Sequence, residues 1–277
     1  MHRKVLERKL LDVIEEDLGF YDITTAFTPD KKVEAEVVVK ESCVIAGVYE
    51  LSVLFDLFDV EIKDKKNDGN VVKENDIIFR LEGSSHDILC VERVALNILG
   101  VMSGIATLTK EIVDKAREVN PGIRVAATRK TTPLFRYFEK KAVMVGGGDP
   151  HRMRLDDWVL IKDNHLKLFG NVKEALNSAR KSFGHKIEIE VDNIEDALEA
   201  AESGADIVML DNMEIGRIKE TISVLNDRGL RERVIVEVSG GITLDNIHEY
   251  ASTGVDVVSV GELTHSSKVV DFSLMVK

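Results

Sequence analysis

The chain has 277 residues, of which 44% are hydrophobic and 31% are charged, as is typical of a soluble globular protein with one or two domains. Its formal net charge of −12 argues against general nucleic-acid binding, which depends on a positive surface to displace counterions from phosphates. Its longest apolar runs, such as 94–101, are too short to cross a bilayer, so we expect a cytoplasmic protein without a membrane span.

The first hundred residues predict helices and strands in no regular alternation. Apolar residues recur at helical spacing over 5–18, which Gly19 follows as a stop, and again over 47–60. Strand-like patterns cover 33–42 and 71–83, the second around a polar Lys-Glu-Asn-Asp turn. This region is therefore expected to form a mixed α+β domain.

A long helical pattern then runs from 84 to 119. It is interrupted at Ser103 and Gly104, which are weak helix formers. The interruption predicts either two helices or one kinked helix that joins two domains.

After Pro121 and Gly122 the chain changes to a repeated unit of buried strand, loop and amphipathic helix. The predicted strands cover 124–127, 158–161, 187–191, 207–210, 234–238 and 257–260, and 143–145 is a candidate for a short seventh. The predicted helices cover 172–183, 194–203, 215–227 and 244–253. Alternating units of this kind form a parallel sheet covered by helices, either an open doubly wound sheet or a barrel.

Three acids in and after the strand at 187–191 favour the barrel. Alternation places Glu188, Glu190 and Asp192 on one face of this strand and apolar side chains on the other. An open parallel sheet would bury those carboxylates under helices, whereas a barrel turns one face toward its lumen and mouth. We therefore predict an α/β barrel.

Polar groups follow several strands at their carboxyl ends, where the active sites of barrels lie. Lys162 follows one strand, and Asp211 follows another. Glycines follow the last two strands, at Gly240 and Gly261, and allow backbone N–H groups to approach an anion. The predicted mouth therefore contains both charged side chains and a seat for phosphate.

Cations and acids stand close together in this predicted mouth. Cations such as Arg129 and Arg152 suit a ligand with several negative groups. The carboxylates of Glu190 and Asp211 suit Mg²⁺ carried on phosphates, or the hydroxyls of a ribose. Together these groups predict a phosphorylated sugar that meets an anionic second substrate.

Other charged residues of the region are expected to have structural roles and not to bind the ligand. Arg136, Lys140 and Lys141 have the spacing of a solvated helix face. Glu188 and Asp192 are interpreted as lumen partners of basic residues.

Motifs along nearly the whole chain make it similar to the quinolinate phosphoribosyltransferase family, the nicotinate-nucleotide pyrophosphorylases of NAD biosynthesis. These motifs are DLGFYDITT, ERVALNILGVMSGIAT, TRKTTP, EKKAVMVGGGDPHRMRL, VLIKDNH, EIEVDN, LDNM, SGGI and GVDVVSVGELTHS. The resemblance implies an N-terminal α/β sandwich domain followed by an open, TIM-like α/β barrel of seven strands. We expect these domains at 1–105 and 106–264, with the tail 265–277 packed back on the first. The resemblance also implies Mg²⁺ as a cofactor and a homodimer, or a higher oligomer, with a shared active site.

The family's activity is the transfer of the phosphoribosyl group of phosphoribosyl pyrophosphate to quinolinate, with loss of CO₂. Matching positions imply that quinolinate is bound by Arg93, Arg129, His151, Arg152 and Lys162, with Arg93 reaching across the dimer interface. Those that bind the phosphoribosyl group and its phosphates are Lys130, Ser239, Gly240, Gly261 and His265. The implied catalytic residues are Glu190, Asp211, Lys130 and Lys162, and Glu190 and Asp211 also serve Mg²⁺, directly or through the substrate.

The chain departs from the family's pattern at two positions near the predicted mouth. Leu134 stands where glycine is common, and Pro150 stands where asparagine is common. Three functions remain open at this point: transfer to quinolinate, the same transfer to nicotinate or another aromatic acid, and binding of phosphorylated ligands without catalysis.

Overall fold

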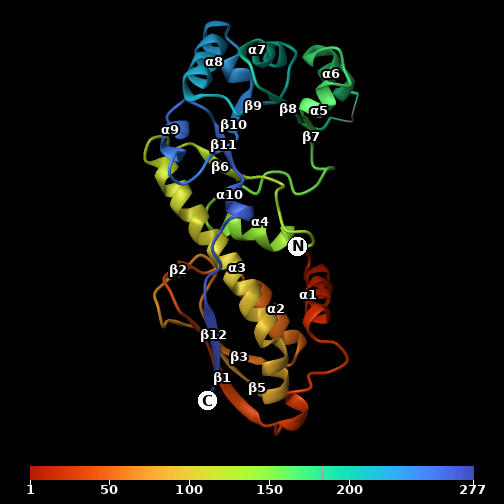
Figure 1. Ribbon diagram of the computed structural model, residues 1–277, viewed down its shortest axis with the longest axis vertical. Coiled ribbons are helices and arrows are strands. Elements are labelled where there is room, and N and C mark those ends of the chain that lie inside the picture. Colours follow the sequence, from red (N-terminus) through yellow and green to blue (C-terminus); the bar gives the residue numbers. More distant parts are fainter. Residues whose placement is uncertain (182–183) are drawn as a thin grey trace. The chain divides into compact units, whose positions relative to one another are not determined.

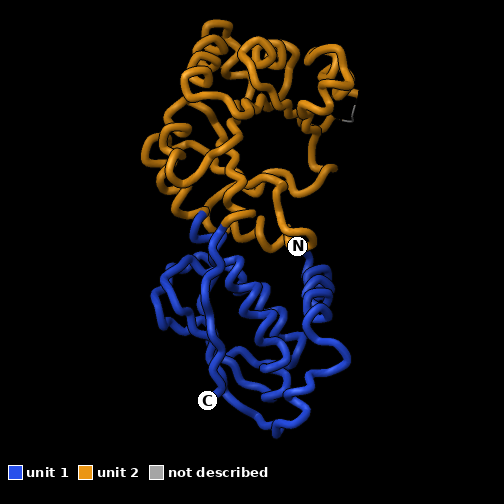
Figure 2. The backbone as a smooth tube through the Cα atoms, in the orientation of Figure 1, with its two compact units in different colours: residues 1–108, 267–277 blue, residues 109–266 orange. Residues whose placement is uncertain are grey.

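The computed structural model describes residues 1–181 and 184–277, and the chain divides into two compact units. Unit 1 comprises residues 1–108 and 267–277, and unit 2 comprises residues 109–266 (Figure 2). These boundaries lie a few residues from those expected at 105 and 264. Because the last residues return to unit 1, this unit is built from both ends of the chain.

Unit 1 contains an antiparallel sheet in the order β12-β1-β5-β3 and a small pair, β2-β4 (Figure 1). Its strands are β1 (Lys32–Val39), β2 (Cys43–Val44), β3 (Glu61–Lys65), β4 (Val71–Val72), β5 (Ile77–Ser84) and β12 (Phe272–Val276). Its helical elements are α1 (Arg3–Asp17), the short η1 (Thr25–Phe27), α2 (Val48–Leu57) and the first part of α3 (Ser85–Arg117). The two strands predicted around the polar turn therefore join different sheets, since β4 pairs with β2 and β5 with β1 and β3.

Apolar side chains at regular spacing build the core of unit 1. Leu6, Leu10 and Ile14 form the buried stripe of α1, four residues apart as a helix requires. Phe55 of α2 packs edge to face against Phe79 of β5, with ring centroids 5.3 Å apart, and both rings are fully buried. Helix α2 is thereby fixed to the sheet by the hydrophobic effect.

Helix α3 runs without interruption through the expected break. Ser103 Oγ instead accepts a hydrogen bond from the backbone N–H of Ala46 at 3.1 Å. At Gly104 a Cβ atom would lie 1.8 Å from the carbonyl oxygen of Lys268. The two small residues therefore allow neighbouring backbone to approach the helix, and they do not end it.

The same helix is long and apolar enough, by length and composition, to cross a membrane. However, 67% of its most apolar window is buried inside the protein. Helix α3 thus has the burial of a core helix.

Unit 2 contains a parallel sheet of six strands in the order β6-β11-β10-β9-β8-β7. Its strands are β6 (Arg124–Ala127), β7 (Val159–Ile161), β8 (Ile187–Val191), β9 (Ile207–Asp211), β10 (Ile235–Ser239) and β11 (Val257–Val260). Its helical elements are α4 (Arg136–Val145), α5 (Asp163–Leu166), α6 (Val172–Ala179), α7 (Ile194–Glu202), α8 (Ile215–Asp227), η2 (Arg231–Arg233), α9 (Ile247–Ala251) and α10 (Glu262–His265). The sheet curls into an open barrel with α6, α7 and α8 outside it, as predicted (Figure 1).

The prediction of a seventh strand at 143–145 is wrong, because these residues close helix α4. Phe138, Ala142 and Val143 are buried at helical spacing, which a short apolar run cannot reveal by itself. Asp149 instead forms a single parallel bridge with Ala126 of β6. In the described part of the chain, the β6 edge of the sheet therefore has this isolated bridge and no seventh strand.

Local signals set the ends of the outer helices. The side chain of Asn193 accepts a hydrogen bond from the backbone N–H of Asp196 at the start of α7. Gly229 and Gly254 follow α8 and α9 in left-handed conformations, at φ 64° and 92°, which is common just after a helix ends. The predicted end of α6, at 182–183, lies outside the described residues.

Replacing Gly104 by Ala should destabilise unit 1. The new Cβ would overlap the Lys268 carbonyl, so we expect the free energy of unfolding in urea to fall by about 1–3 kcal/mol. Gly216→Ala, in α8, is the matched control, because no atom lies within 4 Å of its Cβ position. The control should be neutral or stabilising by up to about 1 kcal/mol, and an equal effect of both changes would contradict the packing argument.

Candidate active site

A cavity of about 730 Å³ lies at the carboxyl ends of the barrel strands in unit 2. The predicted site residues that line it are Arg129, Lys130, His151, Arg152, Lys162, Glu190, Asp211, Ser239, Gly240, Gly261 and His265. Arg93 does not line it and is exposed on α3 in unit 1. Functional groups from separate strand ends therefore share one cavity.

Two arginines leave guanidinium groups without anionic partners in the cavity wall. The Nε atom of Arg129 is buried and has no hydrogen-bond partner among the described residues. Arg152 is 6% exposed, and burial together with the charge of Arg129 lowers its pKa. Neither guanidinium forms an ion pair with a carboxylate in the described part of the chain. A buried guanidinium and a half-buried one, neither of them in an ion pair, favour an anionic ligand with two acidic groups.

The interpretation of Arg136, Lys140 and Lys141 as a solvated helix face is wrong for Lys140. Its side chain is fully buried, and Arg136 and Lys141 are half-buried. The Nζ atom of Lys140 donates to the carbonyl oxygen of Arg152 at 2.9 Å and also to that of Pro150. Burial, followed by the charge of Arg136, lowers the pKa of Lys140 to about 8. Lys140 thus fixes the backbone that carries His151 and Arg152, and its periodic spacing alone gave no sign of this.

The loop after β6 is held by two further contacts. Both carboxylate oxygens of the buried Glu139 accept from the backbone N–H of Thr132, at 3.2 and 3.1 Å. Thr264 Oγ1 donates to the carbonyl oxygen of Lys130 at 2.7 Å. These bonds fix the backbone from the carbonyl group of Lys130 to Thr132.

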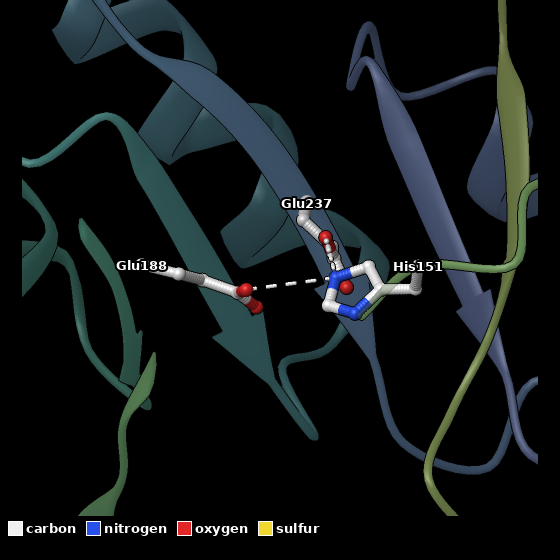
Figure 3. Close-up of side chains that lie close together, drawn as sticks. All are labelled: His151, Glu188 and Glu237. Atoms are coloured by element: carbon white, nitrogen blue, oxygen red, sulfur yellow. Dashed lines mark hydrogen bonds and ion pairs between the residues drawn. The ribbon is translucent and has the colours of Figure 1, made fainter. Parts of the chain in front are cut away.

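A cluster of His151, Glu188 and Glu237 combines a half-buried histidine with two buried glutamates (Figure 3). The Nε2 atom of His151 is 3.3 Å from Glu237 Oε2 and 3.5 Å from Glu188 Oε2. Burial and the neighbouring charge of Glu237 raise the pKa of Glu188 to about 7. The prediction that Glu188 pairs with a basic side chain is therefore confirmed, and the partner is His151. Glu237 was missed, although an acid within the apolar run VIVEV was a signal for it.

The predicted acid pair comes from neighbouring strands. Glu190 of β8 pairs in register with Met209 of β9, and Asp211 ends β9. Lys162, which follows β7, donates a hydrogen bond to Glu190 Oε2. Asn212 Nδ2 donates to Asp211 Oδ2 at 2.6 Å. The acids are thus fixed at the rim where cations also gather.

Glycine residues at the ends of β10 and β11 line another part of the cavity wall. Gly240 has φ 106°, and a Cβ atom there would lie 2.2 Å from Oδ1 of Asn212. At Gly261 a Cβ atom would lie 3.0 Å from Nε2 of His265. Glycine is therefore required at Gly240, and at Gly261 a side chain would have to displace the His265 ring slightly. Both glycines line the cavity, where the sequence predicts a seat for phosphate.

Two family models cover most of the chain. The model for the N-terminal domain of quinolinate phosphoribosyl transferase matches residues 22–103, and that for its C-terminal domain matches residues 105–275. The chain belongs to the quinolinate phosphoribosyltransferase family.

Relatives of this family resemble the chain over nearly its full length. It is 49% identical to a probable nicotinate-nucleotide pyrophosphorylase (carboxylating) of Methanothermobacter thermautotrophicus, across 97% of this chain and 99% of the relative. It is 37% identical to the human nicotinate-nucleotide pyrophosphorylase (carboxylating), across 87% of this chain and 81% of the relative. The structure of the nicotinate-nucleotide pyrophosphorylase from Francisella tularensis, 34% identical, superposes with a TM-score of 0.92 and covers 100% of this chain and 98% of that one.

The two departures from the family pattern have different structural settings. Leu134 has φ 66°, a left-handed conformation that glycine adopts without strain, and it is exposed. The glycine common in quinolinate phosphoribosyltransferases thus matches the backbone here. Pro150 offers its carbonyl oxygen to Lys140, a role in which its side chain takes no part.

Replacing Lys140 by Met should lower stability while nearly preserving side-chain volume. The change leaves buried carbonyl groups without a donor, so we expect unfolding free energy in urea to fall by about 2–4 kcal/mol. Lys110→Met is the matched control, since Lys110 is exposed and pairs with Asp114 one turn away. The control should change stability by less than about 0.5 kcal/mol.

The pH dependence of stability gives a second measurement on the same variants. Between about pH 8 and the ordinary lysine value of 10.5, the folded protein has released the Lys140 proton while the unfolded chain still holds it. Stability of the wild type should therefore rise with pH across this window, relative to Lys140→Met. The free energy of unfolding in urea is measured for both proteins at about pH 7.5 and 9.5. An equal change between the two pH values in both proteins would contradict the buried ammonium group.

Proposed function

We propose that this chain transfers the phosphoribosyl group of phosphoribosyl pyrophosphate to the ring nitrogen of quinolinate and releases pyrophosphate, CO₂ and nicotinate mononucleotide. The observation that carries the proposal is a pair of guanidinium groups without ion pairs among the described residues, Arg129 and Arg152, in a cavity that also holds an acid pair. Membership of the family supports the same activity, as a step of NAD biosynthesis.

The cation end of the cavity would bind quinolinate, which carries two carboxylates. Arg129 and Arg152 can each hold a carboxylate through two N–H groups. His151 and Lys162 add donors beside them, and both line the cavity. An aromatic acid with one carboxylate would leave part of this charge buried and unpaired, which favours quinolinate over nicotinate.

The glycine-lined wall would bind the phosphates of the donor. Backbone N–H groups near Gly240 and Gly261 suit phosphate oxygens, and Ser239, Lys130 and His265 add side-chain donors. A donor held here would present its anomeric carbon toward the cation end. The two substrates would thus meet without diffusing freely, which lowers the entropic part of the barrier.

The acid pair would act on the sugar during transfer. As the bond to pyrophosphate breaks, positive charge develops on the anomeric carbon and ring oxygen, and Glu190 and Asp211 would stabilise it. The ring nitrogen of quinolinate forms the new bond to that carbon, and Lys130 and Lys162 would balance charge around the reacting groups. No covalent enzyme intermediate is required.

Loss of CO₂ would follow on the nucleotide product. The bond from ring carbon 2 to its carboxylate breaks, and the electron pair stays on that carbon beside the positively charged ring nitrogen. Water then supplies a proton to the carbon, which gives nicotinate mononucleotide.

Mg²⁺ fits the acid pair by ligand type, because it prefers carboxylate oxygens and usually keeps several waters. Glu190 and Asp211 would hold it, either directly or through the substrate. When bound, Mg²⁺ neutralises charge on the departing pyrophosphate.

We propose a homodimer, in which Arg93 of one subunit serves the cavity of the other, as the family resemblance implies. Its exposure on α3 is compatible with that role. We also place the protein in the cytoplasm, since Cys43 and Cys90 are both free thiols.

Release of CO₂ with each acceptor tests the proposed function directly. Purified protein with phosphoribosyl pyrophosphate and Mg²⁺ should release CO₂ from quinolinate, in proportion to nicotinate mononucleotide formed. Nicotinate in place of quinolinate should release no pyrophosphate. Release of pyrophosphate with nicotinate would show that the acceptor is misassigned. No product from either acid would favour a binding protein.

Replacing Arg129 by Ala should weaken the reaction through the acceptor. We expect kcat/KM for quinolinate to fall about 100-fold, which corresponds to about 2.7 kcal/mol, because a buried carboxylate would lose its charged partner. Arg228→Ala, an exposed arginine of the same unit at 3.8 Å from Glu202, is the control and should have no effect. A loss below about threefold in Arg129→Ala would exclude the carboxylate role.

A further inference from the structure

Only one member of the cluster of His151, Glu188 and Glu237 reaches the cavity wall. His151 lines the cavity, whereas neither glutamate does. The dashed lines in Figure 3 join both glutamates to the Nε2 atom of the imidazole. Among the described residues, none forms a hydrogen bond with Nδ1 of His151. The ring is therefore held at one nitrogen and left open at the other.

Neighbouring side chains fix the two carboxylates against the ring. Trp158 Nε1 donates to Glu188 Oε2 at 2.7 Å, and Ser259 Oγ donates to Glu237 Oε1 at 2.5 Å. The Trp158 ring also packs edge to face on the imidazole, with centroids 4.8 Å apart. Hydrogen bonds from Trp158 and Ser259 hold the two carboxylates, and the indole ring packs against the imidazole. These contacts together fix the imidazole in one orientation.

Charged groups face His151 from each element packed around it. Glu188 comes from β8, Glu237 from β10, Lys140 from α4, and Asp149 from the preceding loop. Burial disfavours the charged imidazole, and so does Lys140, but the hydrogen bond to Glu237 and the charges of both glutamates outweigh them and raise its pKa. A charged imidazole carries a proton on each nitrogen, so Nδ1 is then a donor.

We propose that Glu237 and Glu188 are positioning residues that keep His151 as a charged donor to one carboxylate of an aromatic dicarboxylate acceptor. The inference rests on the proposed function and names how its cavity recognises the second carboxylate. A neutral ring with its proton on Nε2 would present the lone pair of Nδ1 to that carboxylate, and two acceptors repel each other. A charged ring instead forms a charge-assisted hydrogen bond. Two buried acids thus contribute to the binding of a negatively charged substrate.

Binding of quinolinate alone, measured by titration calorimetry on the full-length protein, tests the proposal. Glu237→Gln keeps the size of the side chain and removes its charge. At about pH 7.5 its Kd should rise about tenfold, and at about pH 5.5 the difference should shrink as His151 regains its proton. Asp206→Asn is the matched control, because this carboxylate accepts from the backbone N–H of Ile187 and does not line the cavity. The control should leave Kd unchanged.

A double-mutant cycle separates positioning from a merely structural role. In a His151→Asn background, Glu237→Gln should cause no further loss of quinolinate affinity, because the group through which it acts is gone. The pKa of His151, followed by NMR and assigned with His151→Asn, should fall by about one to three units in Glu237→Gln. If Glu237→Gln does not fold, Glu188→Gln is measured in the same way and should lower the same pKa.

Three results would overturn the inference. They are an unchanged His151 pKa in the folded variants, a loss of affinity that persists in the His151→Asn background, and a tightly bound metal ion that Glu237→Gln removes. The last is a defined alternative, because one ligand atom from each residue of the cluster lies within 4.8 Å of the others. A wild type that releases no CO₂ would contradict the proposed function alone, whereas an unchanged pKa would contradict this inference alone.

Discussion

Parallel pairing of the strands in unit 2 is the constraint on which the proposed site depends. Because neighbouring strands point the same way, their carboxyl ends reach the same rim, and residues distant in the chain meet there. Lys162 follows β7, Glu190 is the last but one residue of β8, and Asp211 ends β9, and these three strands are neighbours in the sheet. The outward faces of these strands are apolar and covered by helices, so polar groups collect in the lumen and at the rim.

Opposite charges coexist in the cavity because most of the acids already have partners within the protein. Glu190 accepts from Lys162, and Glu237 accepts from Ser259. Lys140 is satisfied by neutral carbonyl groups and therefore consumes no carboxylate. The charges of Arg129 and Arg152 consequently remain available to a ligand, although the chain as a whole is strongly acidic.

The parts of the fold that repeat could be predicted from the sequence, and those set by tertiary contacts could not. Strand 187–191 is predicted to the residue, because its alternation and its flanking polar residues agree. The run at 143–145 is too short for periodicity to distinguish strand from helix. The burial of Lys140 and the contact of Gly104 with Lys268 depend on segments distant in sequence, so no local pattern reveals them. The position of Arg93 relative to a cavity is likewise outside what spacing can predict.

Strand β12 determines when the antiparallel sheet of unit 1 can be completed during synthesis. It pairs with β1, so that Ala35 stands opposite Val276 near the other end of the chain. During synthesis, β1 therefore keeps one unpaired edge until the ribosome has made all of unit 2. An edge of this kind can template pairing between nascent chains. The aggregation resistance of the newly made protein thus depends on how soon its final strand reaches β1.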